Sequence, residues 1–224
     1  MFLYHNATKR KNMNQIRLLQ EIIDGIGTPV LSDIQKEQYK KYFSLLLETN
    51  ELHNLTAILD PKKIVSHHLL DSLAITSFVD MQKITSIADV GTGAGLPGIP
   101  LKIYAPHLKV ILIEVHKKKI LFLERIIQEL NLKDIIIYSE DWRTFLRKTH
   151  FDVTLFLSRA SLKTDELIRM FKPSCFYKDA TLIYFASKDW QSTKQDAQYM
   201  YEQKQYMIEN KERSLIFFKN NTKV

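Results

Sequence analysis

The stretch Ile87-Ala-Asp-Val-Gly-Thr-Gly-Ala-Gly-Leu-Pro-Gly-Ile-Pro100 decides the fold of this chain. It opens with a short apolar run, ending at Asp89-Val90, that is typical of a buried strand. Glycine permits the tight turn and the close backbone approach that a nucleotide-type cofactor requires at the first strand-to-helix turn of a doubly wound sheet. Four of the six glycines of the chain follow the run, at Gly91, Gly93, Gly95 and Gly98. The stretch therefore predicts a cofactor site at the carboxyl end of a parallel strand.

The pattern of the chain changes close to this stretch. Over residues 1–80, apolar residues recur at helical spacing, and Ser32-Asp-Ile-Gln35 and Asp60-Pro61 are typical helix starts. We therefore expect an N-terminal helical region of about three helices there. Over residues 81–224, short β-branched or aromatic runs alternate with helical ones, which predicts an α/β fold built from parallel βαβ units. We expect the two regions to form one compact unit.

Individual strands follow from the same pattern. The segment from Gln191 to Arg213 is polar and lacks such runs, so it predicts a helix and a loop rather than strands. The runs that predict strands are Ile87–Val90, Val110–Ile113, Ile135–Tyr138, Val153–Leu157, Thr181–Phe185 and Leu215–Phe218.

Composition narrows the class of protein. The formal net charge is +7, which favours a polyanionic partner such as RNA or DNA. The single cysteine, Cys175, excludes an internal disulfide framework, and no Cys/His spacing indicates a metal site. No apolar run approaches the roughly 20 residues of a membrane span. We expect a soluble, cytoplasmic protein that makes no use of a membrane.

The glycine turn also spells a dinucleotide motif. Residues Gly93 to Gly98 match G-x-G-x-x-G, which would indicate a nicotinamide-dependent oxidoreductase. However, an acid at the strand end, Asp89, would repel a pyrophosphate, and Pro97 and Pro100 disturb the helix start whose amides would hold it. A cofactor with a cationic centre suits an acidic, glycine-rich pocket better. We therefore favour S-adenosylmethionine and keep the oxidoreductase as an alternative.

Two residues beyond the turn have two interpretations each. Glu114 ends the second predicted strand, where a carboxylate can accept hydrogen bonds from both ribose hydroxyls; alternatively it caps the strand and pairs with Lys117 or Lys118. Trp142 follows the third predicted strand, where it can cover an adenine ring or pack on the sheet edge.

These residues carry a resemblance to a known family. The chain resembles the RsmG (GidB) family of bacterial small-subunit ribosomal RNA methyltransferases, which methylate a guanine at N7. The matching segments are Asn54-Leu-Thr-Ala-Ile with Asp60-Pro61, His68-Leu-Leu-Asp71-Ser-Leu, the Asp89-to-Pro100 stretch, Lys118-Lys-Ile-Leu-Phe-Leu123, Phe151-Asp152, Ser158-Arg-Ala160 and Glu212-Arg213. The resemblance implies a Rossmann-like, mostly parallel sheet of seven strands. It also implies S-adenosylmethionine as cofactor and small-subunit (16S) rRNA or the small ribosomal subunit as partner. We expect the protein to be a monomer.

The resemblance assigns cofactor contacts and shows two departures. The family typically has an acid where this chain has Arg143, and Asp189 stands where the family often has glycine. A non-catalytic RNA-binding relative is therefore a third hypothesis. The expected cofactor-binding residues are Gly91, Gly93, Leu96, Glu114, Trp142, Arg143 and Arg159.

Substrate residues are assigned in the same way. Guanine N7 is a lone pair without a proton, so methyl transfer needs no general base and depends on proximity and orientation. Arg159 and Lys188 are expected to position the substrate by holding guanine O6 or a phosphate. His68 and Asp71 are expected to line the substrate cleft, although His68 can instead be a buried, hydrogen-bonded core histidine.

Overall fold

A seven-stranded sheet forms the centre of the protein. The computed structural model describes residues 2–220, with side chains from residue 13 onward. The strand order is β3-β2-β1-β4-β5-β7-β6; β7 pairs antiparallel with both β5 and β6, and the other pairs are parallel. This confirms the predicted mostly parallel, seven-stranded, Rossmann-like sheet. The strands are β1 (Ser86–Val90), β2 (Lys109–Ile113), β3 (Ile135–Tyr138), β4 (Leu155–Arg159), β5 (Thr181–Ala186), β6 (Met200–Ile208) and β7 (Lys211–Phe218).

Strand register brings the carboxyl ends of four strands together. Val90 of β1 lies beside Ile113 of β2 and Ser158 of β4, and Ile113 lies beside Tyr138 of β3. All of β1 is buried, as expected for a parallel strand with helices on both faces. The residues that follow these strands therefore meet at one edge of the sheet.

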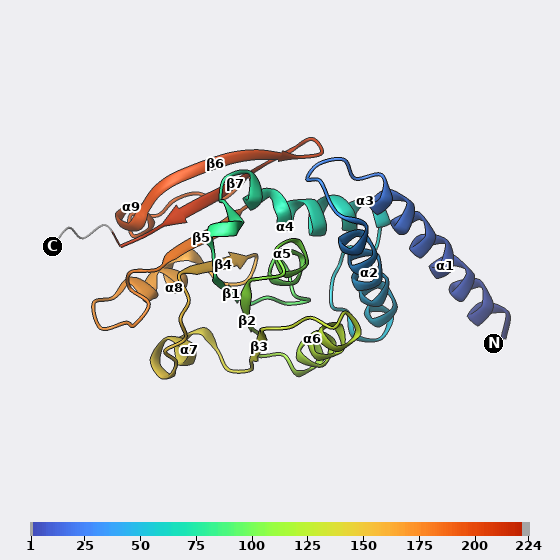
Figure 1. Cartoon of the computed structure of the whole chain (residues 1–224), viewed down its shortest axis with the longest axis horizontal. Helices are drawn as coiled ribbons and strands as arrows, with labels where there is room; N and C mark the ends of the chain where they lie inside the picture. The colour runs from blue at the N-terminus through green and yellow to red at the C-terminus, as the bar shows by residue number, and fades with distance from the viewer. Residues whose placement is uncertain (1, 221–224) are drawn as a thin grey trace.

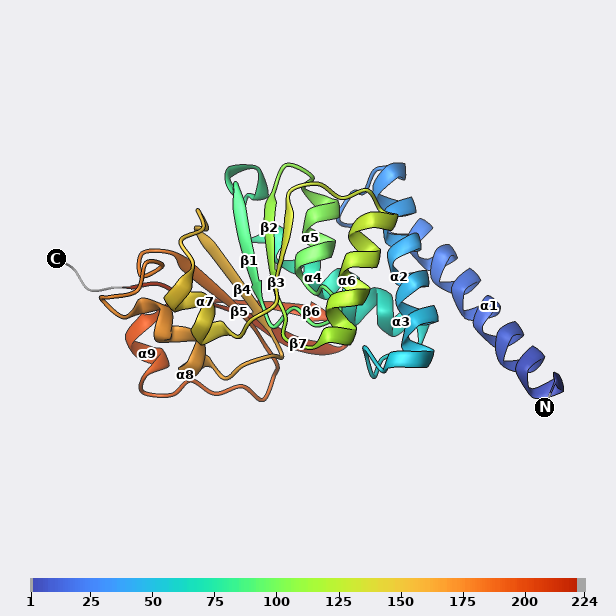
Figure 2. The ribbon, with the colours of Figure 1, turned by 90° about the horizontal axis from the view of Figure 1, so that it is seen from below.

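Helices cover both faces of the sheet (Figures 1 and 2). On one face lie α5 (Gly98–Tyr104) and α6 (Lys117–Glu129), flanked by the N-terminal helices. The other face carries α7 (Trp142–Lys148), α8 (Thr164–Leu167) and α9 (Asp196–Tyr199). Upstream of the sheet, the structure has α1 (Phe2–Asp24), which begins earlier than the helix expected around Ile16 to Ile26, and the expected α2 (Asp33–His53) with its predicted Ser32 capping box. A third helical run follows, made of α3 (Pro61–Ile64), the π-helical η1 (Val65–Leu70), α4 (Asp71–Leu73) and the 3₁₀ turn η2 (Ala74–Ser77).

The helical region packs directly against the glycine turn. Two fully buried tyrosines of α2 donate hydrogen bonds to its backbone: Tyr39 Oη to the Pro100 carbonyl (2.9 Å) and Tyr42 Oη to the Ala94 carbonyl (2.6 Å). The N-terminal helices therefore help to fix the glycine turn.

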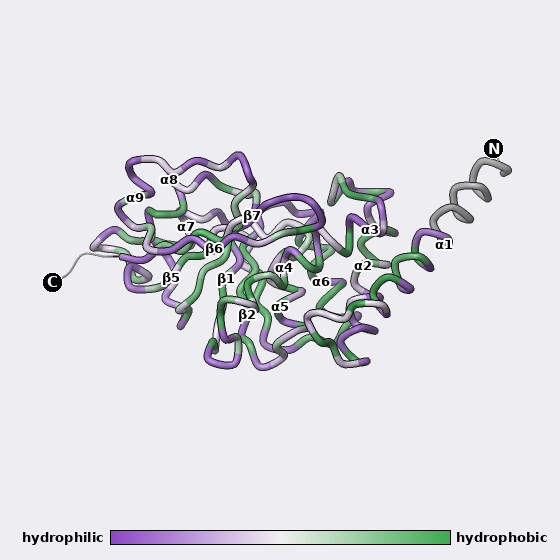
Figure 3. The backbone as a smooth tube through the Cα atoms, turned by 90° about the horizontal axis from the view of Figure 1, so that it is seen from above, coloured by the Kyte–Doolittle hydropathy of each residue, from purple (hydrophilic) through white to green (hydrophobic). Residues whose placement is uncertain are grey.

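Figure 3 shows hydrophobic segments in green along the inner elements and hydrophilic ones in purple on the outer loops.

The polar segment before the last strand is the main correction to the predicted elements. Beyond the short helix α9, residues Met200–Ile208 form the edge strand β6 rather than a loop. Its half-buried side carries Glu202 and Lys204, which form an ion pair, while its other side exposes Tyr201 and Met207. Because neither side is an apolar stripe, the alternation that usually identifies a strand is absent from its sequence.

None of the helices between residues 2 and 220 combines the length and the apolar content that crossing a bilayer requires.

Candidate cofactor site

The glycine turn after β1 has the backbone geometry that requires glycine. Gly91, Gly93 and Gly95 have φ values of 67°, 63° and 98°, in the left-handed region that L side chains rarely adopt. A Cβ on Gly91 would lie 2.3 Å from the Cβ of Ser161, whereas a Cβ on Gly93 would meet no atom within 4 Å. Gly91 therefore allows the β4 loop to approach closely, and Gly93 leaves open space in front of the turn.

Asp89 fixes this turn from inside the protein. Its side chain is fully buried, and its Oδ2 accepts hydrogen bonds from Thr92 Oγ1 (2.6 Å) and from the Gly98 amide (2.8 Å). Burial raises the pKa of Asp89 to about 6, although both hydrogen bonds oppose the rise. Asp89 thus ties the end of β1 to the start of α5. Asp89 does not line the adjacent cavity, so other acids, Glu114 among them, face a ligand there.

A cavity of about 850 Å³ lies at the carboxyl ends of β1, β2, β3 and β4. This is where an open α/β sheet binds nucleotide ligands, and the volume suits a molecule of nucleoside size. Of the predicted cofactor residues, Gly91, Glu114, Trp142 and Arg143 line it. Gly93, Leu96 and Arg159 are not among its lining residues.

Glu114 is one of three acids that line this cavity, with Asp141 and Glu166. Only 4% of the residue is exposed. Its Oε2 accepts a hydrogen bond from the Gly93 amide (3.0 Å), and its Oε1 accepts one each from the Val115 and His116 amides (both 2.9 Å). A carboxylate offers about four acceptor positions, so about one is left for a ligand hydroxyl. The lysine beside it is Lys119, at 3.8 Å, rather than one of the two lysines expected from the sequence.

Trp142 lies between the cavity and the core behind α7. Its indole Nε1–H donates to the Glu166 carbonyl (3.0 Å), its ring stacks on Phe145 at 5.8 Å, and only 4% of the residue is exposed. Neighbouring Arg143 points outward and makes two parallel hydrogen bonds to the Glu166 carboxylate, at 2.9 and 2.7 Å. Hydrogen bonding to Arg143 lowers the pKa of Glu166. The arginine that departs from the family pattern therefore has a partner supplied by α8.

Arg159 and Asp71 meet in a buried network although 88 positions separate them in sequence. Arg159 Nη1 donates to Asp71 Oδ2 (2.9 Å) and to the His67 carbonyl (3.1 Å). The other oxygen of Asp71 accepts from Tyr206 Oη (2.8 Å) and lies 3.4 Å from Nε of Arg213. Asp71 is fully buried, so α4, β4, β6 and β7 are joined at one carboxylate.

Two members of this network, Arg213 and Tyr206, were not predicted from the sequence. Arg213 lies in the Glu212-Arg213 pair that carries part of the family resemblance, which was the available signal. Tyr206 belongs to the unrecognised strand β6 and gave no signal.

His68 has the geometry of a buried, hydrogen-bonded histidine. It is 8% exposed, and its Nε2 lies 2.9 Å from Thr56 Oγ1. Burial, helped by the nearby Arg159, lowers the pKa of His68 to about 4. The imidazole is therefore neutral at neutral pH. Its partner Thr56 is itself held by Asn50, whose Oδ1 accepts from the Thr56 amide at 2.7 Å.

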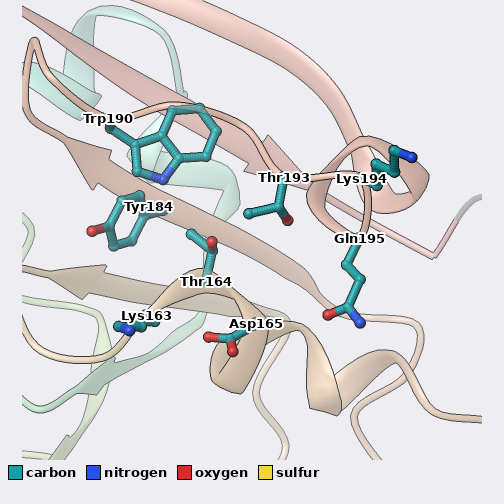
Figure 4. A pocket seen from close by; sticks show the side chains of 8 residues that line it. All are labelled: Lys163, Thr164, Asp165, Tyr184, Trp190, Thr193, Lys194 and Gln195. Atoms are coloured by element: carbon teal, nitrogen blue, oxygen red, sulfur yellow. The ribbon is translucent and has the colours of Figure 1, made fainter.

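Lys188 stands apart from these residues. It is exposed on the turn after β5, which the Trp190 amide closes by donating to the Ser187 carbonyl (3.1 Å). A second cavity, of about 560 Å³, lies beside this turn (Figure 4). Trp190 and Tyr184 line it, with ring centroids 6.2 Å apart, and Lys188 does not. The structure therefore does not place Lys188 at either of these two cavities.

The chain matches a known protein family over most of its length. Residues 35–220 match the GidB family, described as rRNA small subunit methyltransferase G. The chain belongs to the GidB family. The resemblance inferred from sequence is thus confirmed. The description of this family names a methyltransferase and not a nicotinamide-dependent oxidoreductase.

Individual relatives of this GidB-family chain carry the same description. The ribosomal RNA small subunit methyltransferase G of Bacillus pumilus is 43% identical over 115 residues, covering 51% of this chain and 48% of the relative. That of Carboxydothermus hydrogenoformans is 37% identical over 158 residues, covering 67% and 66%. The match therefore spans about half the length of the Bacillus relative.

Solved structures share the fold at low sequence identity. The human methyltransferase 10 domain containing protein superposes with a TM-score of 0.53 at 14% identity, covering 67% of this chain and 81% of that chain. A precorrin-6y C5,15-methyltransferase from Geobacter metallireducens gives a TM-score of 0.50 at 15% identity, covering 67% and 87%. Identities this low support the Rossmann-like fold alone.

Proposed function

We propose that this GidB-family protein transfers a methyl group from S-adenosylmethionine to N7 of a guanine in small-subunit rRNA. The observation that carries the proposal is the cavity at the carboxyl ends of β1 to β4, bordered by the glycine turn and by Glu114. The family description and the shared methyltransferase fold support the same activity. The formal charge of +7 suits an RNA substrate.

The residues of the cavity fit a sulfonium nucleoside. Gly91 borders the cavity with bare backbone, and the nearby Gly93 position leaves open space in front of the turn, so a ligand can approach the glycine turn. Glu114 is held rigidly by three backbone amides and keeps about one acceptor position for a ribose hydroxyl. Trp142 and Arg143 border the cavity at the start of α7, beside the expected adenine. The cofactor supplies the electrophilic methyl group when it is bound.

Catalysis then depends on positioning. Guanine N7 carries a lone pair and no proton, so no side chain has to accept a proton. The chain only has to hold N7 in line with the methyl carbon and the sulfur. The buried Arg159–Asp71 pair stiffens the β4 end next to the cofactor turn. We assign Arg159, Asp71 and His68 to the wall of the substrate cleft. Lys188, which is exposed, is assigned to a contact with the incoming RNA. The protein acts as a monomer in the cytoplasm.

Two measurements test the proposal. In calorimetry, S-adenosylhomocysteine should bind and NAD should not. With labelled S-adenosylmethionine, the protein should transfer label to small ribosomal subunits or to their rRNA. Binding of S-adenosylhomocysteine without transfer to either substrate would leave the alternative of a non-catalytic RNA-binding relative.

A further inference from the structure

A third cavity lies on the outer side of α7, between that helix and the turn formed by residues 172–176. Its volume is about 690 Å³. Its lining contains no acidic residue and shares Arg143 and Arg147 with the cofactor cavity. We call it the basic groove, because its lining includes Arg143, Arg147, His150, Arg169 and Lys172.

Positive charge remains in the basic groove after local pairing. Glu166, just outside the lining, accepts hydrogen bonds from Arg143 and lies 3.1 Å from Nε of Arg169. One carboxylate thus serves two guanidinium groups. Lys172 is exposed and makes no ion pair with any residue of the described range. A surface with this excess of cations attracts a polyanion.

An aromatic side chain lies among these cations. Phe176 is 55% exposed, and its ring packs edge-on against His150 with centroids 4.8 Å apart. Cations that follow a backbone, together with an exposed ring on which a base can stack, are the combination found in grooves for single-stranded nucleic acid.

We propose that the basic groove binds the phosphate backbone of the RNA strand next to the target guanine. Complementary charge selects the ligand, and Phe176 offers a stacking surface for a base. Arg143 and Arg147 line both the groove and the cofactor cavity, so a strand in the groove lies directly beside the cofactor site. The proposal rests on the function proposed above, since it takes small-subunit rRNA as the substrate.

The first test is a charge reversal in the groove. Lys172→Glu is compared with Lys133→Glu, a matched change at an exposed lysine in the loop before β3. Binding to a fluorescent small-subunit rRNA fragment is measured by anisotropy over a range of salt. We expect Lys172→Glu to weaken binding several-fold at low salt and to reduce the slope of log K against log salt by about 0.7, the value of one phosphate contact in single strands. Equal binding and equal slopes for the two variants would overturn the proposal.

The single cysteine gives a second readout. Cys175 lines the groove and is partly buried, so RNA in the groove should slow its alkylation by a maleimide. S-adenosylhomocysteine alone should leave the rate unchanged. An alkylation rate that saturating rRNA does not change would place the RNA elsewhere and refute the proposal.

These readouts separate the groove from the proposed function. Wild-type methyl transfer by Lys172→Glu, with an unchanged KM for RNA, would refute the groove and leave the methyltransferase assignment intact. If the wild type transfers no methyl group while rRNA still protects Cys175, the methyltransferase assignment fails and RNA binding in the groove stands.

Discussion

Replacing Asp71 with asparagine should strongly destabilise the fold. The carboxylate is fully buried and receives Arg159 at 2.9 Å, Tyr206 at 2.8 Å and Arg213 at 3.4 Å. Asparagine keeps the shape but removes the charge, so two arginine side chains that are only 10% and 23% exposed lose their counter-charge. Removing one partner of a buried ion pair costs about 3–5 kcal/mol.

The assay is urea denaturation followed by circular dichroism, with thermal unfolding as a second measure. For a chain of this size, each kcal/mol of lost folding free energy lowers the thermal midpoint by about 2–4 °C, so the thermal midpoint of the variant should fall by roughly 6–20 °C. Asp189→Asn, the same change at an exposed position, should unfold at the wild-type urea concentration. The double variant Asp71→Asn/Arg159→Met should recover part of the loss, because one unpaired guanidinium is removed. Asp71→Asn with wild-type stability would refute the assignment of this carboxylate as the link between helices and sheet.

Three further changes probe the site. Burial lowers the pKa of His68 from its ordinary value of 6.5 to about 4 in the folded protein. As the pH falls, the unfolded chain therefore binds a proton at this histidine before the folded chain does. Folding stability should therefore fall from about pH 6.5 to pH 4, and His68→Gln should remove on the order of 3 kcal/mol of this dependence in urea titrations at each pH. Gly91→Ala should cost more stability than Gly93→Ala, since both have positive φ but only Gly91 faces Ser161; equal losses would contradict this. Glu114→Gln should weaken S-adenosylhomocysteine binding about tenfold or more in calorimetry, with exposed Glu124→Gln as the control.

Local features of the fold could be predicted from sequence. The run ending at Val90 and the glycines after it specify a buried strand and a left-handed turn through local chemistry, and the structure has both. Strand β6 escaped prediction because its half-buried side carries Glu202 and Lys204, so its pairing with β7 depends on the antiparallel partner rather than on its own pattern.

Long-range contacts of the site were less predictable. Glu114 was located correctly at the end of β2, but its binding of the Gly93 amide depends on how two loops meet. Asp89 was expected to face the ligand, but it lies outside the cavity lining, because Thr92 and the Gly98 amide bind its carboxylate inside the protein and the sequence does not reveal these contacts. Arg143 likewise finds Glu166, which lies 23 positions away and became a neighbour only through folding.

Methyl transfer to small-subunit rRNA, with mapping of the modified base, tests the central claim most directly. The account predicts that label from S-adenosylmethionine appears on a single guanine and that the modified RNA becomes cleavable by borohydride and aniline, as N7-methylguanosine is. Label on another base or another guanine atom, or no transfer by a protein that binds S-adenosylhomocysteine, would contradict it.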